Sequence, residues 1–336
     1  MLSGGTMANN EKCLEKWKNI TVEEFTKLLA ALPRIPSKPE DRERHEYHGY
    51  LFPKDMTPEV LDALKTWEVR EDDVFLITFP KAGTTWMQEI VSIVLKDGNF
   101  DAIKNTHNWM RAPYMELTPV NHHSQLEQVP PSYMVVNNMA SPRFIKSHLP
   151  AKLLPNQIYE KKPKIIYVTR NPKDLVVSYY HFTKYIPTIQ KYETFGDCLE
   201  EFSVGRVGGG NWFTENLFWW NKRHDANVLF VKYEDMQKDL RSVVVQVCDF
   251  LQKPLSNAII DQIVEHSSFT NMKRNPMSNP DSLKINDPNV DGKLSFMRKG
   301  KVGDWKNMLT VAQNEKFDEL FRIKMAGSGL TFDFEI

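Results

Sequence analysis

The sequence has few cysteines and no long apolar run. Its 336 residues include three cysteines, Cys13, Cys198 and Cys248, which are odd in number and far apart. This spacing argues against a disulfide framework and a cysteine metal cluster, and it is typical of a reducing compartment. The longest apolar runs are too short to span a bilayer, and the first residues lack the apolar core of a signal peptide. We therefore expect a cytoplasmic protein with no membrane partner.

The sequence also lacks a net charge. Lysine plus arginine and aspartate plus glutamate both number 43, so no overall field attracts nucleic acid or an anionic membrane. We expect no nucleic-acid partner, and any bound anion must be held by local charge. A chain of this length can bury a substantial core. Strand-like runs at 74–79, 143–147, 164–169 and 227–231 alternate with helical stretches. That alternation predicts an α/β fold with a parallel sheet.

Residues 74–86 are the most informative segment. An apolar run ends at Pro80, and before a helical pattern there follow Lys81, Gly83, Thr84, Thr85 and Trp86. This order predicts a strand, a tight turn and a helix N-terminus, where backbone N–H groups and the helix dipole suit an anion. The threonines can cap the helix, and the indole offers a face to a nucleotide base. Because Lys81 precedes Gly83, the segment differs from a Walker A loop. The alternative is an ordinary strand-to-helix turn.

A second segment places a cation at the end of a strand. In Lys164–Phe182, Arg170 follows an apolar run, Pro172 can be the first residue of a helix, and Ser178 lies about two turns into that helix. The carboxyl edge of an open α/β sheet is where ligands bind, so Arg170 and Ser178 could hold a second phosphate. Taken alone, Arg170 is equally a surface ion-pair partner.

A third segment, near the C-terminus, forms a compact basic loop. Arg298 and Lys299 stand beside Gly300, which adds no steric bulk. Such a loop can bind phosphate, although a solvated charge pair is the simpler interpretation of these residues alone.

Together the three segments resemble the cytosolic sulfotransferase family, from about Tyr47 to the C-terminus and in the family's order. The resemblance implies one sulfotransferase domain over 46–336, with a central parallel sheet flanked by helices in the P-loop-kinase-like sulfotransferase fold. Residues 1–45 are then an N-terminal extension. The implied donor is 3′-phosphoadenosine 5′-phosphosulfate (PAPS), which leaves as adenosine 3′,5′-bisphosphate (PAP), and no metal is implied.

The resemblance also implies the catalytic residues. His148, in the segment Arg143–Pro150, matches the family's general base, and an imidazole suits proton removal near neutral pH. Lys81, with Lys146, is expected to stabilise the leaving phosphate. Ser178 is expected to contact both the 3′-phosphate and the catalytic lysine.

A larger set is implied for the donor site. Its members are Lys81, Ala82, Gly83, Thr84, Thr85, Trp86, Arg170, Ser178, Tyr233, Ser267, Phe269, Met272, Phe296, Arg298, Lys299 and Gly300. Two of them depart from the commoner family pattern: Ala82 stands where serine is usual, and Ser267 where threonine is common. Ala82 loses one possible side-chain hydrogen bond to the donor, but neither change removes a charged group, so we expect activity to persist.

The acceptor is less closely defined. The segment 111–117 resembles the family's acceptor-lining segment, and the implied contacts are Tyr114, Leu117, Phe182 and Phe213. An apolar pocket around a base suits a small hydrophobic acceptor, such as a phenol, a steroid or bile alcohol, or an amine. A nucleotide kinase and a catalytically silent nucleotide-binding protein are the alternatives from other classes.

Three further features concern organisation. Thr21 and Glu24 form a capping-box pattern ahead of a one-sided apolar helix, and prolines then indicate an extended linker. This helix could dock on the domain, bind a partner or serve no role. The loop Asn275–Ser295 is expected to be a lid or a passive excursion. Residues Lys306–Glu315 fit the family's dimerisation pattern and predict a homodimer.

Overall fold

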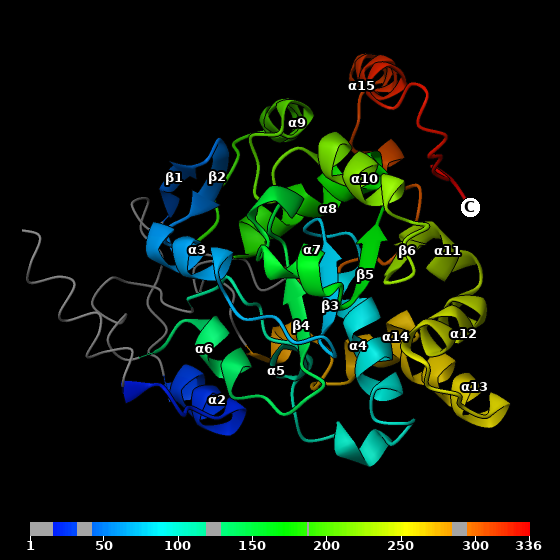
Figure 1. Cartoon of the computed structure of the whole chain (residues 1–336). Helices are drawn as coiled ribbons and strands as arrows, with labels where there is room; N and C mark the ends of the chain where they lie inside the picture. The colour runs from blue at the N-terminus through cyan, green and yellow to red at the C-terminus, as the bar shows by residue number, and fades with distance from the viewer. Residues whose placement is uncertain (1–15, 32–41, 119–128, 187, 284–293) are drawn as a thin grey trace, which may run out of the picture.

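A computed structural model describes residues 16–31, 42–118, 129–186, 188–283 and 294–336 (Figure 1). Its centre is a parallel four-stranded sheet in the order β4-β3-β5-β6. The strands are β3 (Val74–Thr78), β4 (Phe144–Ser147), β5 (Lys164–Thr169) and β6 (Val228–Lys232). The predicted parallel α/β sheet is confirmed, and every predicted strand end falls within one residue of the observed one.

Alternate residues of β3 pack against opposite layers, because side chains of a strand alternate between its two faces. Val74 and Leu76 belong to one apolar cluster, and Phe75 and Ile77 to another. The first cluster contains residues of α4 (Thr84–Val94), α12 (Leu240–Leu251) and α13 (Asn257–His266). The second contains residues of α3 (Pro58–Lys65), α6 (Ser132–Asn137) and α7 (Gln157–Lys161). Helices thus cover both faces of the sheet (Figure 1), as a parallel sheet requires.

A third cluster lies beyond the carboxyl ends of the strands. It joins α8 (Pro172–Tyr185), α9 (Phe195–Val204), α10 (Trp212–Asn221) and α15 (Val311–Lys324). Pro172 opens α8 as predicted, and the side chain of Asn171 accepts a hydrogen bond from the Asp174 N–H to cap it. Shorter helices are α5 (Asn108–Arg111), α11 (Tyr233–Lys238) and α14 (Phe269–Arg274), and there are short 3-10 turns η2 (Phe100–Ala102), η4 (Ala151–Leu153), η5 (Pro280–Leu283) and η6 (Asp304–Asn307).

The strand order positions the site. β4 lies on one side of β3, and β5 followed by β6 on the other, so the chain leaves β3 toward β4 but leaves β5 toward β6, in the opposite direction across the sheet. At such a switch point the carboxyl edge of the sheet opens into a crevice that binds ligands. Because the strands are parallel, the segments that follow β3, β4, β5 and β6 all begin at this edge.

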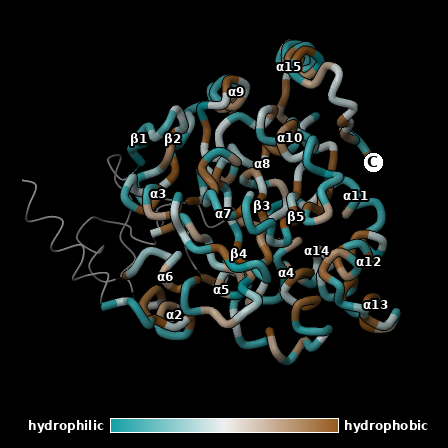
Figure 2. Tube along the Cα trace, viewed as in Figure 1, coloured by the Kyte–Doolittle hydropathy of each residue, from teal (hydrophilic) through white to brown (hydrophobic). Residues whose placement is uncertain are grey.

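The N-terminal helix α2 (Val22–Ala31) docks on the body of the protein. Its predicted capping box is confirmed: the Glu24 N–H donates to Thr21 Oγ1, and the Thr21 N–H donates to the Glu24 carboxylate. Phe25 is buried against Met110 and Val135, and Figure 2 shows apolar residues on α2. Of the three roles left open by the sequence, docking is therefore the one observed.

A two-stranded hairpin, β1 (Arg44–Tyr47) and β2 (Tyr50–Pro53), follows α2. The predicted boundary between 45 and 46 falls inside β1, and it stays a prediction. The predicted proline linker and residues 284–293 of the predicted lid lie outside the described residues. Within the described ranges, no helix is both long and apolar enough to cross a membrane.

Candidate functional site

A cavity of about 730 Å³ lies at the carboxyl edge of the sheet. It collects side chains that the sequence places far apart, and most of the predicted site residues line it. These are Lys81, Gly83, Thr84, Thr85, Trp86, Tyr114, Leu117, His148, Arg170, Ser178, Phe182, Tyr233, Ser267, Phe269, Met272, Phe296, Arg298, Lys299 and Gly300. The two expected phosphate segments, the basic loop and the expected base therefore share one enclosure.

Two predicted site residues lie in the core instead. The side chain of Ala82 is fully buried in the cluster around α8, and its N–H donates to the Phe79 carbonyl. Phe213 is buried between α10 and α15, where its ring packs on Trp212 and Phe317. The prediction that Phe213 faces the acceptor is therefore corrected, because the apolar face of α10 is turned toward α15.

Lys146 also fails to line the cavity. Its side chain is 1% exposed, and Nζ donates to Gln88 Oε1 at 3.2 Å. Its Nζ lies 4.3 Å from the centre of the Tyr114 ring, and burial holds the pKa of Lys146 well below the ordinary value. Lys146 thus packs against the ring of Tyr114 and does not reach the cavity. This position does not favour the predicted direct contact with the leaving group.

The turn after β3 is built on two residues with left-handed backbone. Lys81 has φ of 73° and Gly83 has φ of 113°. A Cβ on Gly83 would lie 2.9 Å from Tyr233 Cδ2, so only glycine fits. Helix α4 starts at Thr84 with Gly83 as its N-cap and no side-chain cap. The predicted threonine cap is wrong, because the Thr84 hydroxyl bonds the Thr78 hydroxyl at 2.7 Å instead.

Lys81 projects from this turn onto two aromatic faces. Its Nζ lies 3.8 Å from the centre of the Phe296 ring and 4.4 Å from that of Phe182. Burial, followed by the charges of Arg170 and Arg298, lowers the pKa of Lys81 to about 7. Three cations therefore repel one another across the cavity, which is the arrangement expected of a site built for an anion.

Three residues expected at the donor site retain unused hydrogen-bonding groups. Arg170 donates through one nitrogen to the Lys301 carbonyl, but its Nε is buried without a partner. The hydroxyl of Ser267 and the indole Nε1 of Trp86 are also buried and unpartnered. Because buried polar groups are normally satisfied, these atoms indicate that a polar ligand belongs between them.

The basic loop is held by a carboxylate. Arg298 donates to Asp304 Oδ2 at 2.6 Å, and Lys299 pairs with the other oxygen. Burial opposes ionisation of Asp304, yet the bonds from Lys299, Asn307 and Arg298 lower its pKa to about 2. Gly300 (φ 62°) permits close approach of Phe269, whose Cδ2 would lie 2.3 Å from an added Cβ. Asp304 thereby fixes the side chains of Arg298 and Lys299 where they line the cavity.

His148 is fixed in one tautomer at the end of β4. Its Nδ1 is 2.8 Å from the Thr78 carbonyl, so Nδ1 carries the proton and donates it there. Nε2 is then the acceptor, and the Tyr114 hydroxyl donates to it at 2.7 Å. Burial lowers the pKa of His148 to about 3. The imidazole is therefore neutral, and its basic nitrogen faces the cavity.

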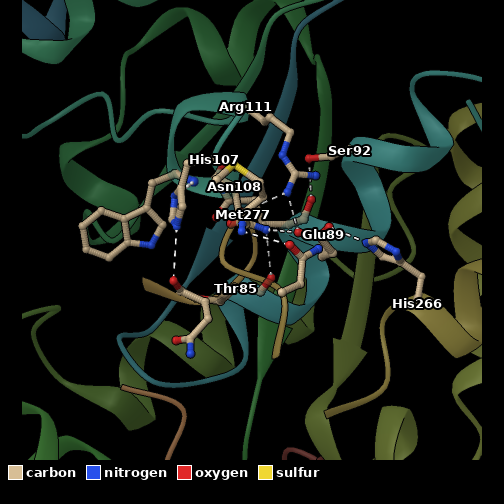
Figure 3. A network of polar contacts seen from close by, with 12 residues as sticks. Thr85, Glu89, Ser92, His107, Asn108, Arg111, His266 and Met277 are labelled. Carbon is tan, nitrogen blue, oxygen red and sulfur yellow. Dashed lines mark hydrogen bonds and ion pairs between the residues drawn. The ribbon is translucent and has the colours of Figure 1, made fainter. Parts of the chain in front are cut away.

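A buried polar network centred on Glu89 of α4 lies next to the cavity (Figure 3). The carboxylate of Glu89 accepts from Asn108 and Arg111 at 2.6 Å and contacts His266 Nε2 at 2.8 Å. Burial would raise the pKa of Glu89, but its bonds to His266 and Arg111 lower it to about 2. The network ties α5, which carries the cavity residue Trp109, to the C-terminal end of α13 just before Ser267.

Sequence reasoning missed several cavity residues. Phe25, Thr26 and Leu29 of α2 line the cavity, as do Trp109 and Asp55. The apolar face of α2 was visible in the sequence, but the surface that covers it was not. Among the described residues, no group of three or more His, Cys, Asp or Glu side chains is arranged to hold a metal ion.

The turn after β3, the aromatic pair Trp86 and Tyr233 and the neutral imidazole of His148 thus border one cavity at the carboxyl edge of a parallel sheet. Residues 71–329 match the sulfotransferase domain family, and the chain belongs to that family. It is 42% identical over 274 residues to sulfotransferase 1E1 from Bos taurus, covering 81% of this chain and 90% of the relative. The predicted family resemblance is confirmed.

Solved structures agree with this assignment. The mouse sulfotransferase SULT7A1 complexed with PAP is 34% identical, with a TM-score of 0.66, and the match covers 85% of this chain and 95% of that one. Retinol dehydratase in complex with androsterone and the inactive cofactor PAP is 25% identical, with a TM-score of 0.78, over 92% of this chain and 96% of that one.

Proposed function

We propose that this protein transfers the sulfonate group of PAPS to a hydroxyl or amine of a small hydrophobic acceptor. The observation that carries the proposal is the meeting of Lys81, Arg170 and Arg298 with His148 in one cavity. The relatives' solved structures hold PAP, and the unpartnered atoms of the donor side suit that nucleotide.

The donor is placed by charge and stacking. Arg170, Arg298 and Lys299 take the 3′-phosphate, with Ser178 beside them. Trp86 and Tyr233, whose ring centres are 5.4 Å apart, form the wall against which adenine packs. Lys81 takes the bridging oxygen and then the leaving 5′-phosphate, where charge develops during transfer.

His148 removes the acceptor proton at Nε2. The Tyr114 hydroxyl occupies that nitrogen, so the acceptor hydroxyl takes the place of the phenol when it binds. The Thr78 carbonyl keeps Nδ1 protonated and stabilises the imidazolium formed during transfer. The new oxygen–sulfur bond forms as the bond from sulfur to the 5′-phosphate oxygen breaks, and PAP leaves.

The test is turnover of phenol, steroid-alcohol and amine acceptors with PAPS in the presence of a chelator. Sulfonated product without Mg²⁺ is the expected result. Activity with ATP and Mg²⁺ alone would favour the nucleotide-kinase alternative. PAP binding without turnover of any acceptor would favour the silent nucleotide-binding protein.

Binding of PAP is expected to weaken as pH rises above about 7. In the free protein the pKa of Lys81 is lowered to about 7, and the phosphates of bound PAP raise it. The contribution of the charged lysine to PAP affinity is therefore fully present below pH 7. It decreases as the pH rises from about 7 to the pKa of Lys81 in the complex. We expect affinity to fall about fivefold between pH 7 and pH 8. Calorimetry in buffers of different ionisation enthalpy measures the proton uptake, which Lys81→Met should remove.

Helix α2 is expected to select apolar acceptors. Leu29 of α2 lines the cavity, whereas its neighbour Leu28, in the same helix, packs on the apolar cluster around Phe25 and is not among the lining residues. Leu29→Ala should raise the KM for an alkylphenol roughly fourfold to fifteenfold, because the half-buried side chain loses contacts worth about one to two methylenes at about 0.8 kcal/mol each. Leu28→Ala is the matched control. Equal KM values for the two variants would contradict a role for α2 in the acceptor pocket.

A cytoplasmic location stays a prediction of the sequence. We also propose a homodimer whose interface is formed by Lys306–Glu315. Val311 is 76% exposed at the start of α15, so its apolar surface is free to meet a symmetry mate. Lys306 lies 2.7 Å from Glu335 of its own chain, and pairing with the partner's Glu315 requires that contact to open. The patch is small, so the dimer should be weaker than an obligate one.

Val311→Glu is expected to produce monomers that retain turnover, because it brings two like charges together near the two-fold axis. Sedimentation at micromolar concentration measures the change, and Ile323→Glu, also exposed on α15, is the control. A monomeric wild type, or a dimeric Val311→Glu protein, would show that the interface lies elsewhere or does not exist.

A further inference from the structure

Asp55 stands apart in the charge pattern of the cavity. The charged residues that line it are Arg44, Asp55, Lys81, Arg170, Arg298, Lys299 and Lys301, so Asp55 is the one carboxylate among the described lining residues. A carboxylate near the phosphates would weaken binding of a bisphosphorylated nucleotide. We therefore expect the Asp55 carboxylate to act on the acceptor rather than on the nucleotide.

The carboxylate of Asp55 has few partners. Oδ1 is buried without a hydrogen bond, and Oδ2 accepts one long bond, from the Thr188 hydroxyl at 3.3 Å. The backbone of the same residue is well fixed, because its carbonyl accepts from the Thr118 N–H at 2.9 Å. No ion pair of Asp55 is formed within the described ranges. The side chain is thus held in place while most of its hydrogen-bonding capacity is unused.

Asp55 lies beside the segment expected to contact the acceptor, because its carbonyl accepts from the Thr118 N–H, next to Leu117. Leu51, Met56 and Leu117 line the same cavity, and none of these residues carries a charge. Gln190, two residues after the Thr188 that contacts Asp55, lines the cavity too, and its side-chain oxygen is also buried without a partner. Burial raises the pKa of Asp55 to about 6, so the carboxylate is still mostly ionised near neutral pH. An ionised, unpaired group in an apolar wall gains most from a cation.

We propose that Asp55, assisted by Gln190, is a recognition site for a protonated amine carried by the acceptor in addition to the group that receives the sulfonate. The inference rests on the proposed function and narrows its acceptor class to hydroxyl compounds, phenols above all, that bear a basic amine. Neither side chain is hydrogen-bonded to His148, Lys81 or Tyr114, so the amine is a second group on the acceptor rather than the nucleophile.

The experiment compares two matched series of acceptors with PAPS. One series is para-alkylphenols, and the other is para-(aminoalkyl)phenols in which an ammonium replaces the terminal methyl, with tethers of increasing length. In the wild type, at the best tether length, kcat/KM should favour the ammonium by about tenfold or more, because a site built to hydrogen-bond rejects analogues that lack the group. Asp55→Asn, an isosteric change, should abolish that preference while changing turnover of the alkylphenols less than about twofold.

Controls separate the possible outcomes. Glu59→Gln removes an exposed carboxylate of α3 and should leave the preference unchanged. Gln190→Leu should reduce the preference partially and serves as a second variant if Asp55→Asn folds poorly. A preference that is equal in wild type and both variants, or absent at every tether length, overturns the proposal. Failure of the wild type to sulfonate any phenol, alkyl or amino, would instead reject the proposed function itself.

Discussion

Replacing His148 with alanine is expected to lower turnover with PAPS by about a hundredfold to ten-thousandfold, because this is the typical contribution of a positioned general base. The imidazole is neutral, is oriented through Nδ1 by the Thr78 carbonyl and presents Nε2 to the cavity. Affinity for PAP should change little, since the nucleotide is held by the cations of the donor side. Steady-state kinetics and calorimetry on the same preparation measure both quantities.

His224→Ala is the matched control, because that histidine is exposed on the loop before β6. It should leave both turnover and PAP affinity unchanged. Near-normal turnover of His148→Ala with several acceptors would remove His148 from the mechanism. A parallel loss of PAP affinity would mean that the residue supports the cavity rather than the chemistry.

The turn after β3 shows how much of the site the sequence could predict. Proline restricts the backbone and glycine permits the positive φ that a tight turn needs, so the strand, the turn and the start of α4 followed from residues 74–86 alone. The cap was predicted wrongly, because glycine can also occupy the N-cap position and Thr84 then forms the first turn. Local rules gave the element but not the choice between two capping residues.

Long-range contacts were predictable only where the family resemblance supplied them. Arg170 and Arg298 meet across 128 positions of sequence, and no periodicity indicates that. The resemblance failed at Phe213, because an aromatic residue on an apolar helix can face either a cavity or a neighbouring helix. It was silent on α2, since residues 1–45 have no counterpart in the matched segments. The packing of Phe25 on Met110 and Val135 depends on surfaces assembled from distant segments.

Arg298→Ala is expected to weaken PAP much more than adenosine 5′-phosphate, which lacks the 3′-phosphate. A charge-assisted hydrogen bond contributes about 1.5–3 kcal/mol, so PAP affinity should fall roughly tenfold to 150-fold. Adenosine 5′-phosphate should lose less than about twofold. Calorimetric titration of both ligands into wild type and variant measures the ratio, and Arg322→Ala, whose guanidinium is exposed on α15 and pairs with Glu319, is the control.

Asp304 sharpens this prediction. In the free protein its carboxylate holds Arg298 and Lys299 together, so removal of Arg298 leaves Lys299 alone to offset that negative charge. The remaining loop then offers less net attraction to a dianionic phosphate, while the 5′ side of the cavity, where Lys81 and Gly83 lie, is unchanged. The ratio of the two losses therefore separates 3′-phosphate recognition from a general weakening of the site. Equal losses for PAP and adenosine 5′-phosphate would show that the basic loop serves another purpose.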